Sequence, residues 1–145
     1  MSEPYRVLFL CVHNSARSQM AEAVLRAIGG DAFEVYSAGS EPTQVHPFTL
    51  RALQDAQIDA TGLHSKSVTE FIAQPFEYVI TLCDDEVCPV FPGAMTRLHW
   101  GMPDPSAANG DSAERLAAFH QTLTVIQARV NEFVRTVSQI QNISA

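Results

Sequence analysis

The alternation of two hydrophobic patterns constrains the fold of this chain more than any other feature of its sequence. Short apolar runs rich in β-forming residues predict buried strands, and apolar residues spaced three or four positions apart predict amphipathic helices. Strands are expected at residues 5–10, 33–38, 78–82 and 95–98, and helices from residue 15 or 17 to about 28 and at 47–57, 68–73 and 111–140. Strands separated by helices pair in parallel through right-handed crossovers. We therefore expect an α/β fold, a three-layer αβα sandwich with a four-stranded parallel sheet.

The size and charge of the chain limit what this fold can do. Its 145 residues suit one hydrophobic core, so residues 1–145 are expected to form a single domain. The formal net charge of −7 argues against nucleic-acid binding, and local positive groups must attract any anionic substrate. The apolar run at residues 7–12 is too short for a signal peptide or a membrane span. We expect a cytoplasmic protein, monomeric and not bound to membranes.

The segment from Cys11 to Ser18 joins the first expected strand to the first expected helix, and it carries the residues with the clearest chemistry. Backbone N–H groups in such a turn point inward and, with the positive end of the helix dipole, bind a tetrahedral oxyanion. The residues expected to form this oxyanion site are Val12, His13, Asn14, Ser15, Ala16 and Arg17. Arg17 can bind two anion oxygens at once.

Cys11 stands at the mouth of this positive environment, which favours its thiolate and makes it a candidate in-line nucleophile. Ser18 can donate a hydrogen bond to the sulfur. A lone cysteine that ends a buried strand is more often an inert apolar residue. The arginine and serine that follow at this spacing favour the nucleophile instead. We expect the His13 side chain to shape the rim of the site rather than to act as a base.

The chain contains three cysteines, an odd number that suits reactive thiols better than structural disulfides. Cys83 follows the third expected strand as Cys11 follows the first. If these strands are neighbours, their axes lie about 4.8 Å apart, so the two cysteines start near the Cα separation of a disulfide, about 4.4–6.8 Å. Cys88 lies beyond a short acidic segment, residues 84–87, and could exchange a Cys11–Cys83 disulfide for an exposed Cys83–Cys88 disulfide.

The Cys11-x5-Arg17-Ser18 pattern near the N-terminus, with Asp104-Pro105 before the last helix, resembles the low-molecular-weight protein tyrosine phosphatases. The arsenate reductases built on the same fold share both motifs, and the resemblance covers nearly the whole chain. It implies that Asp104 is the general acid that protonates the leaving oxygen. The Cys88-Pro89 and His99-Trp100-Gly101 segments resemble the thioredoxin-coupled reductases. We expect Trp100 to pack under the Asp104 loop rather than to contact a ligand.

Two activities begin with the same thiolate attack on an oxyanion. A phosphatase hydrolyses the phosphocysteine, whereas a reductase uses a second thiol to expel arsenite. Ser106 and Ala107 follow Asp104-Pro105, so no aromatic residue stands there to hold a phosphotyrosine ring. We expect an arsenate reductase with a Cys11–Cys83–Cys88 relay. The alternatives are a phosphatase acting on phosphate monoesters and a thiol redox sensor.

We expect no bound cofactor and no metal; thioredoxin is the expected external reductant, with a glutathione–glutaredoxin system as the alternative. Some of the reductases that the chain resembles bind potassium beside the loop through an acidic residue, and here Lys66 stands in that segment. We expect its ammonium to replace the ion, near Asn14, Glu22 and Ser37. The alternative is a solvated surface lysine.

Overall fold

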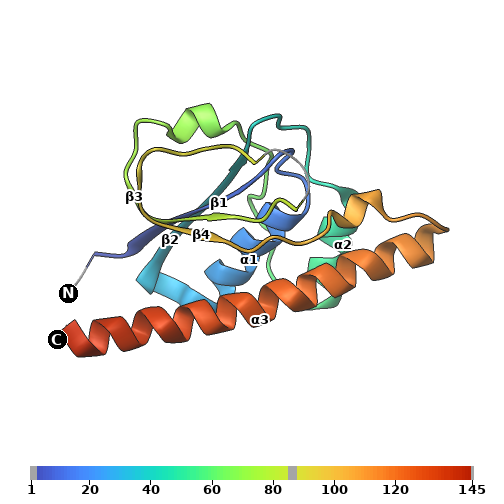
Figure 1. The fold of residues 1–145 in the computed structure, drawn as a ribbon. Helices are drawn as coiled ribbons and strands as arrows, with labels where there is room; N and C mark the ends of the chain where they lie inside the picture. The colour runs from blue at the N-terminus through green and yellow to red at the C-terminus, as the bar shows by residue number, and fades with distance from the viewer. Residues whose placement is uncertain (1–2, 85–87, 145) are drawn as a thin grey trace.

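A single parallel sheet forms the centre of the computed structural model, which describes residues 3–84 and 88–144 (Figure 1). Its strands are β1 (Tyr5–Cys11), β2 (Phe33–Gly39), β3 (Phe76–Thr81) and β4 (Ala94–His99). They lie in the order β2-β1-β3-β4, and every pairing is parallel. The predicted four-stranded parallel sheet is therefore confirmed, and β1 and β3 are neighbours as the cysteine argument requires.

Helices cover the two faces of the sheet unequally. The helices α1 (Arg17–Gly29), α2 (Pro47–Asp55) and α3 (Ser112–Ser144) lie on one side, with α1 packed against α3 and β2. The described residues also contain three short 3-10 turns: η1 (Gly30–Ala32), η2 (Val68–Phe71) and η3 (Pro105–Ala107). The turn η2 lies across the sheet from α3 (Figure 1). The expected helix at residues 68–73 is only this turn, and the last helix extends beyond residue 140 to Ser144. None of the helices in the described part of the chain is long and apolar enough to cross a membrane.

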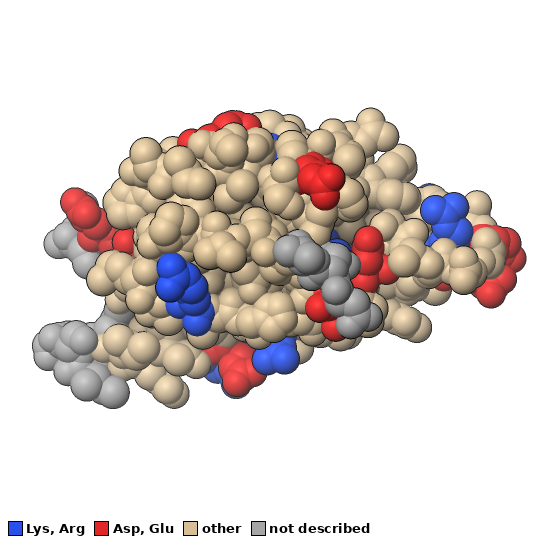
Figure 2. Space-filling view, turned by 45° about the horizontal axis from the view of Figure 1, so that its top comes forward, with Lys and Arg blue, Asp and Glu red and all other residues tan. Residues whose placement is uncertain are grey.

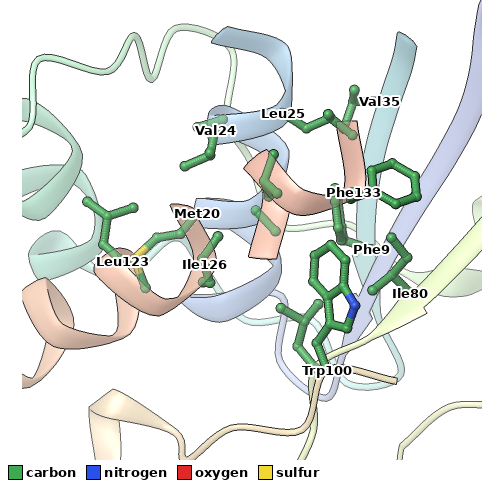
Figure 3. Close-up of a cluster of buried hydrophobic side chains, with 14 of the residues drawn as sticks. Phe9, Met20, Val24, Leu25, Val35, Ile80, Trp100, Leu123, Ile126 and Phe133 are labelled. Carbon is green, nitrogen blue, oxygen red and sulfur yellow. The ribbon is translucent and has the colours of Figure 1, made fainter. Parts of the chain in front are cut away.

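The main hydrophobic core fills the space between the sheet and the helices α1 and α3 (Figure 3). Phe9 and Ile80 contribute from β1 and β3, and both side chains are fully buried. Trp100 packs between Phe9 and Phe133, with ring centroids 5.9 and 6.0 Å away. Burying one such large side chain stabilises a fold by about 1.5–3 kcal/mol. Trp100 thus packs in the core directly after β4, where the chain leads towards Asp104.

The strand ends place the candidate residues on one edge of the sheet. The loop between Cys11 and Arg17 joins β1 to α1, and Cys83 and Asp104 follow β3 and β4 along the chain. Because the strands are parallel, their carboxyl ends share this edge, which is where ligands bind in open α/β sheets.

Candidate active site

Asn14 holds the loop after β1 in its shape. Its φ is 50°, in the left-handed region that asparagine tolerates better than most residues. The buried amide donates to Ser18 Oγ at 2.7 Å and to Ser37 Oγ at 3.0 Å. Its oxygen accepts from Gln19 Nε2 at 2.9 Å and from the Lys66 backbone N–H at 2.8 Å. The sequence predicted a backbone role for Asn14 and its nearness to Lys66 and Ser37, but not these side-chain hydrogen bonds.

The chain after β2 supports the same loop from its other side. A Cβ atom on Gly39 would lie 2.4 Å from the Val12 carbonyl oxygen, so only glycine fits there. The Glu41 and Thr43 backbone N–H groups donate to the carbonyl oxygens of Val12 and His13, at 2.8 and 3.2 Å. The loop is therefore fixed by backbone contacts as well as by Asn14.

The backbone donors of this loop remain available for a ligand. Within the described residues, the N–H groups of residues 13–16 donate to no protein acceptor. The helix α1 begins at Arg17, and no side chain caps its N-terminus. Unpaired N–H groups at the start of a helix bind anions, so an oxyanion would complete this end of the helix.

Cys11 is the last residue of β1 and only 2% exposed. Its Sγ lies 2.8 Å from Ser18 Oγ. Because Asn14 Nδ2 donates to Ser18 Oγ, the serine proton is left to point at the sulfur. The hydrogen bonds thus run in the direction that stabilises a thiolate.

A cavity of about 170 Å³ opens above the Cys11 sulfur. The residues that line it are Cys11, His13, Ser15, Ala16, Arg17, Thr43, Asp104 and Ser106. Val12, Asn14 and Ser18 do not line it; they are buried behind it. The sequence did not identify Thr43, and it singled out Ser106 only as a non-aromatic position, because neither belongs to a motif with its own chemistry.

Arg17 and Asp104 meet across this cavity. The Arg17 Nη1 donates to the carbonyl oxygens of Leu82 and Met102, at 3.3 and 2.9 Å, and Nη2 lies 3.9 Å from Asp104 Oδ2. Asp104 Oδ1 accepts from the Ser106 backbone N–H and hydroxyl, at 2.9 and 2.7 Å. Asp104 therefore forms the turn that an Asp-Pro pair commonly makes and also presents Oδ2 towards the arginine.

The local charge of the cavity, not a broad basic surface, must attract an anion. On the face drawn in Figure 2, Lys and Arg side chains are few and lie apart from one another. Arg17 is 3% exposed and is one of the residues that line the cavity. A charge in such a buried setting is screened by salt much less than a surface charge.

Cys83 and Cys88 form a disulfide with a Cα–Cα distance of 5.6 Å, and Cys11 is free. Cys83 packs with Cys11 and Val12 in one buried cluster, and Cys88 lies against it. The expectation that the whole disulfide is exposed is wrong, because Cys83 is 1% exposed and Cys88 is half-buried. The strand β3 ends at Thr81, so Cys83 comes two residues after the strand, not one. Residues 85–87 of the acidic segment between the two cysteines lie outside the described residues.

Lys66 is buried beside the loop, at 8% exposure. Its Nζ donates to the His64 carbonyl oxygen at 2.8 Å and lies 3.5 Å from Glu22 Oε1. Burial lowers the pKa of the Lys66 ammonium from its ordinary value, and the Glu22 carboxylate opposes that shift. Arg26 pairs with the other Glu22 oxygen at 2.6 Å, and Ser37 Oγ donates to Oε1. The alternative of a solvated surface lysine is therefore wrong.

His46 begins α2 and supports the loop at Ser15. The ring Nδ1 of His46 accepts from the Phe48 backbone N–H at 3.0 Å, and the backbone N–H of His46 donates to the Ser15 carbonyl oxygen at 3.0 Å. Burial lowers the pKa of the His46 imidazole, and nearby Arg115 adds to that shift. The ring must stay neutral at Nδ1 to cap the helix. Across the described residues, no three His, Cys, Asp or Glu side chains are arranged to hold a metal ion.

Comparison with known proteins agrees with this geometry. The family described as low molecular weight phosphotyrosine protein phosphatase matches residues 6–142. An arsenate reductase of Oceanobacillus iheyensis is 37% identical over 132 residues, which are 90% of this chain and 95% of the relative. A solved arsenate reductase in a phosphate-binding state superposes with a TM-score of 0.79 at 28% identity, covering 91% of this chain and 98% of that chain.

A thioredoxin-dependent arsenate reductase of Corynebacterium glutamicum has a TM-score of 0.74 at 31% identity, covering 95% of this chain and 64% of that chain. The family match extends over the sheet, the Cys11 loop and most of the last helix together. The chain belongs to the low molecular weight phosphotyrosine protein phosphatase family.

Proposed function

We propose that this protein reduces arsenate to arsenite through the thiols of Cys11, Cys83 and Cys88. The observation that carries the proposal is the Cys83–Cys88 disulfide packed against Cys11 in one buried cluster. A phosphatase needs no cysteine besides its nucleophile. Reduction of arsenate to arsenite takes two electrons, which a pair of thiols supplies when it is oxidised to a disulfide. The similar proteins named arsenate reductases support the same activity.

The first step is attack of the Cys11 thiolate on arsenic. The N–H groups of residues 13–16 and the Arg17 guanidinium bind the three oxygens that stay on arsenic, and Ser18 steadies the sulfur. Asp104 gives its proton to the departing oxygen, which leaves as water. The Oδ2 atom suits this role because Oδ1 is already bound by Ser106. The product is an arsenate group bonded to the Cys11 sulfur.

The relay then supplies the electrons. The Cys83 thiolate attacks the Cys11 sulfur, a Cys11–Cys83 disulfide forms, and the sulfur–arsenic bond breaks with its electron pair left on arsenic, as arsenite. The Cys88 thiolate attacks Cys83 and frees the Cys11 thiolate. The result is the Cys83–Cys88 disulfide with a free Cys11, the arrangement of this structure.

An external dithiol must reduce that disulfide. Cys88 is the half-buried member and Cys83 the buried one, so the incoming thiolate attacks the Cys88 sulfur. We propose thioredoxin as this reductant, in line with the thioredoxin-dependent relative, with a glutaredoxin–glutathione system as the alternative. Such thiols are maintained in the cytoplasm, where we place the protein, as a monomer.

The family itself supports a second candidate, hydrolysis of phosphate monoesters through a phosphocysteine. The same cavity binds phosphate and arsenate alike, since both are tetrahedral oxyanions. Weak phosphatase activity is therefore compatible with reduction. Strong hydrolysis of aryl phosphates without arsenate reduction would select the phosphatase.

Arsenate turnover with thioredoxin, thioredoxin reductase and NADPH tests the proposal. Wild type is compared with the variants Cys11→Ser, Cys83→Ser and Cys88→Ser. Each substitution should abolish multiple turnover, while Cys83→Ser and Cys88→Ser should keep phosphate binding. If Cys83→Ser and Cys88→Ser retained full turnover, the relay would be wrong. For a redox sensor, peroxide should form the Cys11–Cys83 disulfide while both oxyanion activities stay absent.

A further inference from the structure

His13 lines the oxyanion cavity, but none of the steps above uses its imidazole. We propose that His13 Nε2 binds the outermost oxygen of the substrate, and that it makes the site select inorganic oxyanions over their organic monoesters. The inference rests on the proposed function only in placing a tetrahedral oxyanion above Cys11. It adds the residue that distinguishes a hydroxyl leaving group from an ester leaving group.

The depth of the cavity places His13 next to the leaving oxygen. Cys11 is 2% exposed and lies at the bottom, whereas His13 and Thr43 are exposed and lie at the mouth. A nucleophile attacks a tetrahedral centre in line with the leaving group. The oxygen that leaves therefore points away from Cys11, towards the mouth.

A hydrogen bond fixes the role of each nitrogen in the His13 ring. Nδ1 lies 3.1 Å from the Glu41 carbonyl oxygen, which can only accept, so Nδ1 carries a proton. In the described residues Nε2 has no recorded hydrogen-bond partner. In the neutral ring, Nε2 is thus an acceptor that remains available to a ligand in the cavity that His13 lines. The hydroxyl of hydrogen arsenate or hydrogen phosphate can donate to it, and an ester oxygen has no proton to give.

Protonation of the ring preserves this preference. Nε2 then donates, and a terminal oxygen of an inorganic anion accepts better than an ester oxygen that is bonded to carbon. The rest of the rim offers an organic group little apolar contact, because Thr43, Asp104 and Ser106 are polar. No Phe, Tyr or Trp is among the described residues that line the cavity. Both forms of His13 therefore favour the inorganic anion.

The ring is held in place before any ligand arrives. The His13 carbonyl oxygen accepts from the Thr43 backbone N–H at 3.2 Å and from Ser65 Oγ at 3.0 Å. With the Nδ1 bond to Glu41, the residue is anchored at both its backbone and its side chain. A preorganised partner spends less entropy when it binds a ligand.

The substitution His13→Asn separates the two nitrogens. The asparagine Nδ2 can replace Nδ1 as donor to the Glu41 carbonyl oxygen, but asparagine has no atom at the position of Nε2. The full chain, reduced, is titrated with inorganic phosphate and with methyl phosphate. The readout is protection of Cys11 from iodoacetamide, measured on the Cys11 peptide by mass spectrometry.

Wild type should bind inorganic phosphate about tenfold more tightly than methyl phosphate, the typical effect of one hydrogen bond to a charged group. His13→Asn should bring this ratio close to one, with methyl phosphate binding unchanged. An unchanged ratio would overturn the proposal. An equal loss of both ligands, or an altered alkylation rate without ligand, would assign His13 a purely structural role and overturn it too. Failure of wild type to reduce arsenate would refute the proposed function and leave this binding result intact.

Discussion

Replacing Lys66 by methionine removes the ammonium beside Glu22 while keeping most of the volume of the side chain. Glu22 is 1% exposed, so its carboxylate cannot recover hydration. Removing one member of a buried ion pair costs about 3–5 kcal/mol. Because Arg26 still faces the second Glu22 oxygen at 2.6 Å, we expect the lower end, a loss of about 3 kcal/mol in the free energy of unfolding.

Arg26→Met is the matched control, since it removes the other cation from the same carboxylate. The Arg26 side chain is 44% exposed, and such pairs contribute about 0–1 kcal/mol. Urea unfolding at neutral pH measures both, and with a slope of about 2 kcal/mol/M the Lys66→Met midpoint should fall by about 1.5 M. Equal losses in the two variants, or a Lys66→Met loss below about 0.5 kcal/mol, would refute the assignment of Lys66 as the buried partner of Glu22.

The same site makes a prediction about potassium. Because the Lys66 ammonium already neutralises Glu22, potassium chloride should stabilise wild type no more than choline chloride at equal ionic strength. Lys66→Ser opens space beside Glu22 and the His64 carbonyl oxygen, and should gain stability in potassium chloride specifically. A potassium-specific gain in wild type would contradict the view that the lysine replaces the ion.

Three further predictions concern residues around the cavity. The folded protein binds a proton at His46 less readily than the unfolded chain does, because the pKa of the folded imidazole is lowered, so the free energy of unfolding should fall as pH drops below 6.5. The variant His46→Asn keeps the cap on the Phe48 N–H but does not titrate. Urea midpoints at about pH 7.5 and about pH 5 should therefore differ more in wild type than in this variant. Ser18→Ala should reduce the Cys11 thiolate reactivity near neutral pH about tenfold or more, seen in the pH profile of iodoacetamide alkylation, and an unchanged profile would argue against the hydrogen bond to sulfur. Asp104→Asn should slow hydrolysis of phenyl phosphate about 10²–10⁴-fold but that of p-nitrophenyl phosphate far less, because only the poor leaving group needs a proton; equal effects would exclude the general-acid role.

Most of the parallel sheet could be predicted because β1, β2 and β3 contain apolar runs of the right length, whereas the edge strand β4 has no buried residue and only a short mixed sequence. Phe9 and Ile80 lie in two such runs, and both are fully buried. The turn η2 was predicted as a longer helix, because the apolar residues of its segment fit helical spacing. A capping box at Ser67 and Glu70 starts the turn, and the chain leaves it after Phe71 to enter β3.

The positions of those site residues that the edge of the sheet brings together could be predicted from the sequence. Cys11, Arg17 and Asp104 meet because Cys11 ends β1, Arg17 begins the helix that follows, and Asp104 follows β4 at the same edge of the parallel sheet. The contacts of Asn14 and Lys66 were only partly predictable. The hydrogen bond between Asn14 and the Lys66 backbone joins residues that are 52 positions apart in the chain. It forms only because the segment before η2 packs against the Cys11 loop.

The most direct test of the relay is a single turnover without any external reductant. Fully reduced protein is mixed with excess arsenate, and arsenite and disulfides are counted. We predict one arsenite per chain, a Cys83–Cys88 disulfide and a free Cys11 in wild type, and a trapped Cys11–Cys83 disulfide in Cys88→Ser. Arsenite formed without a disulfide, or no arsenite despite protection of Cys11 by arsenate, would contradict the account.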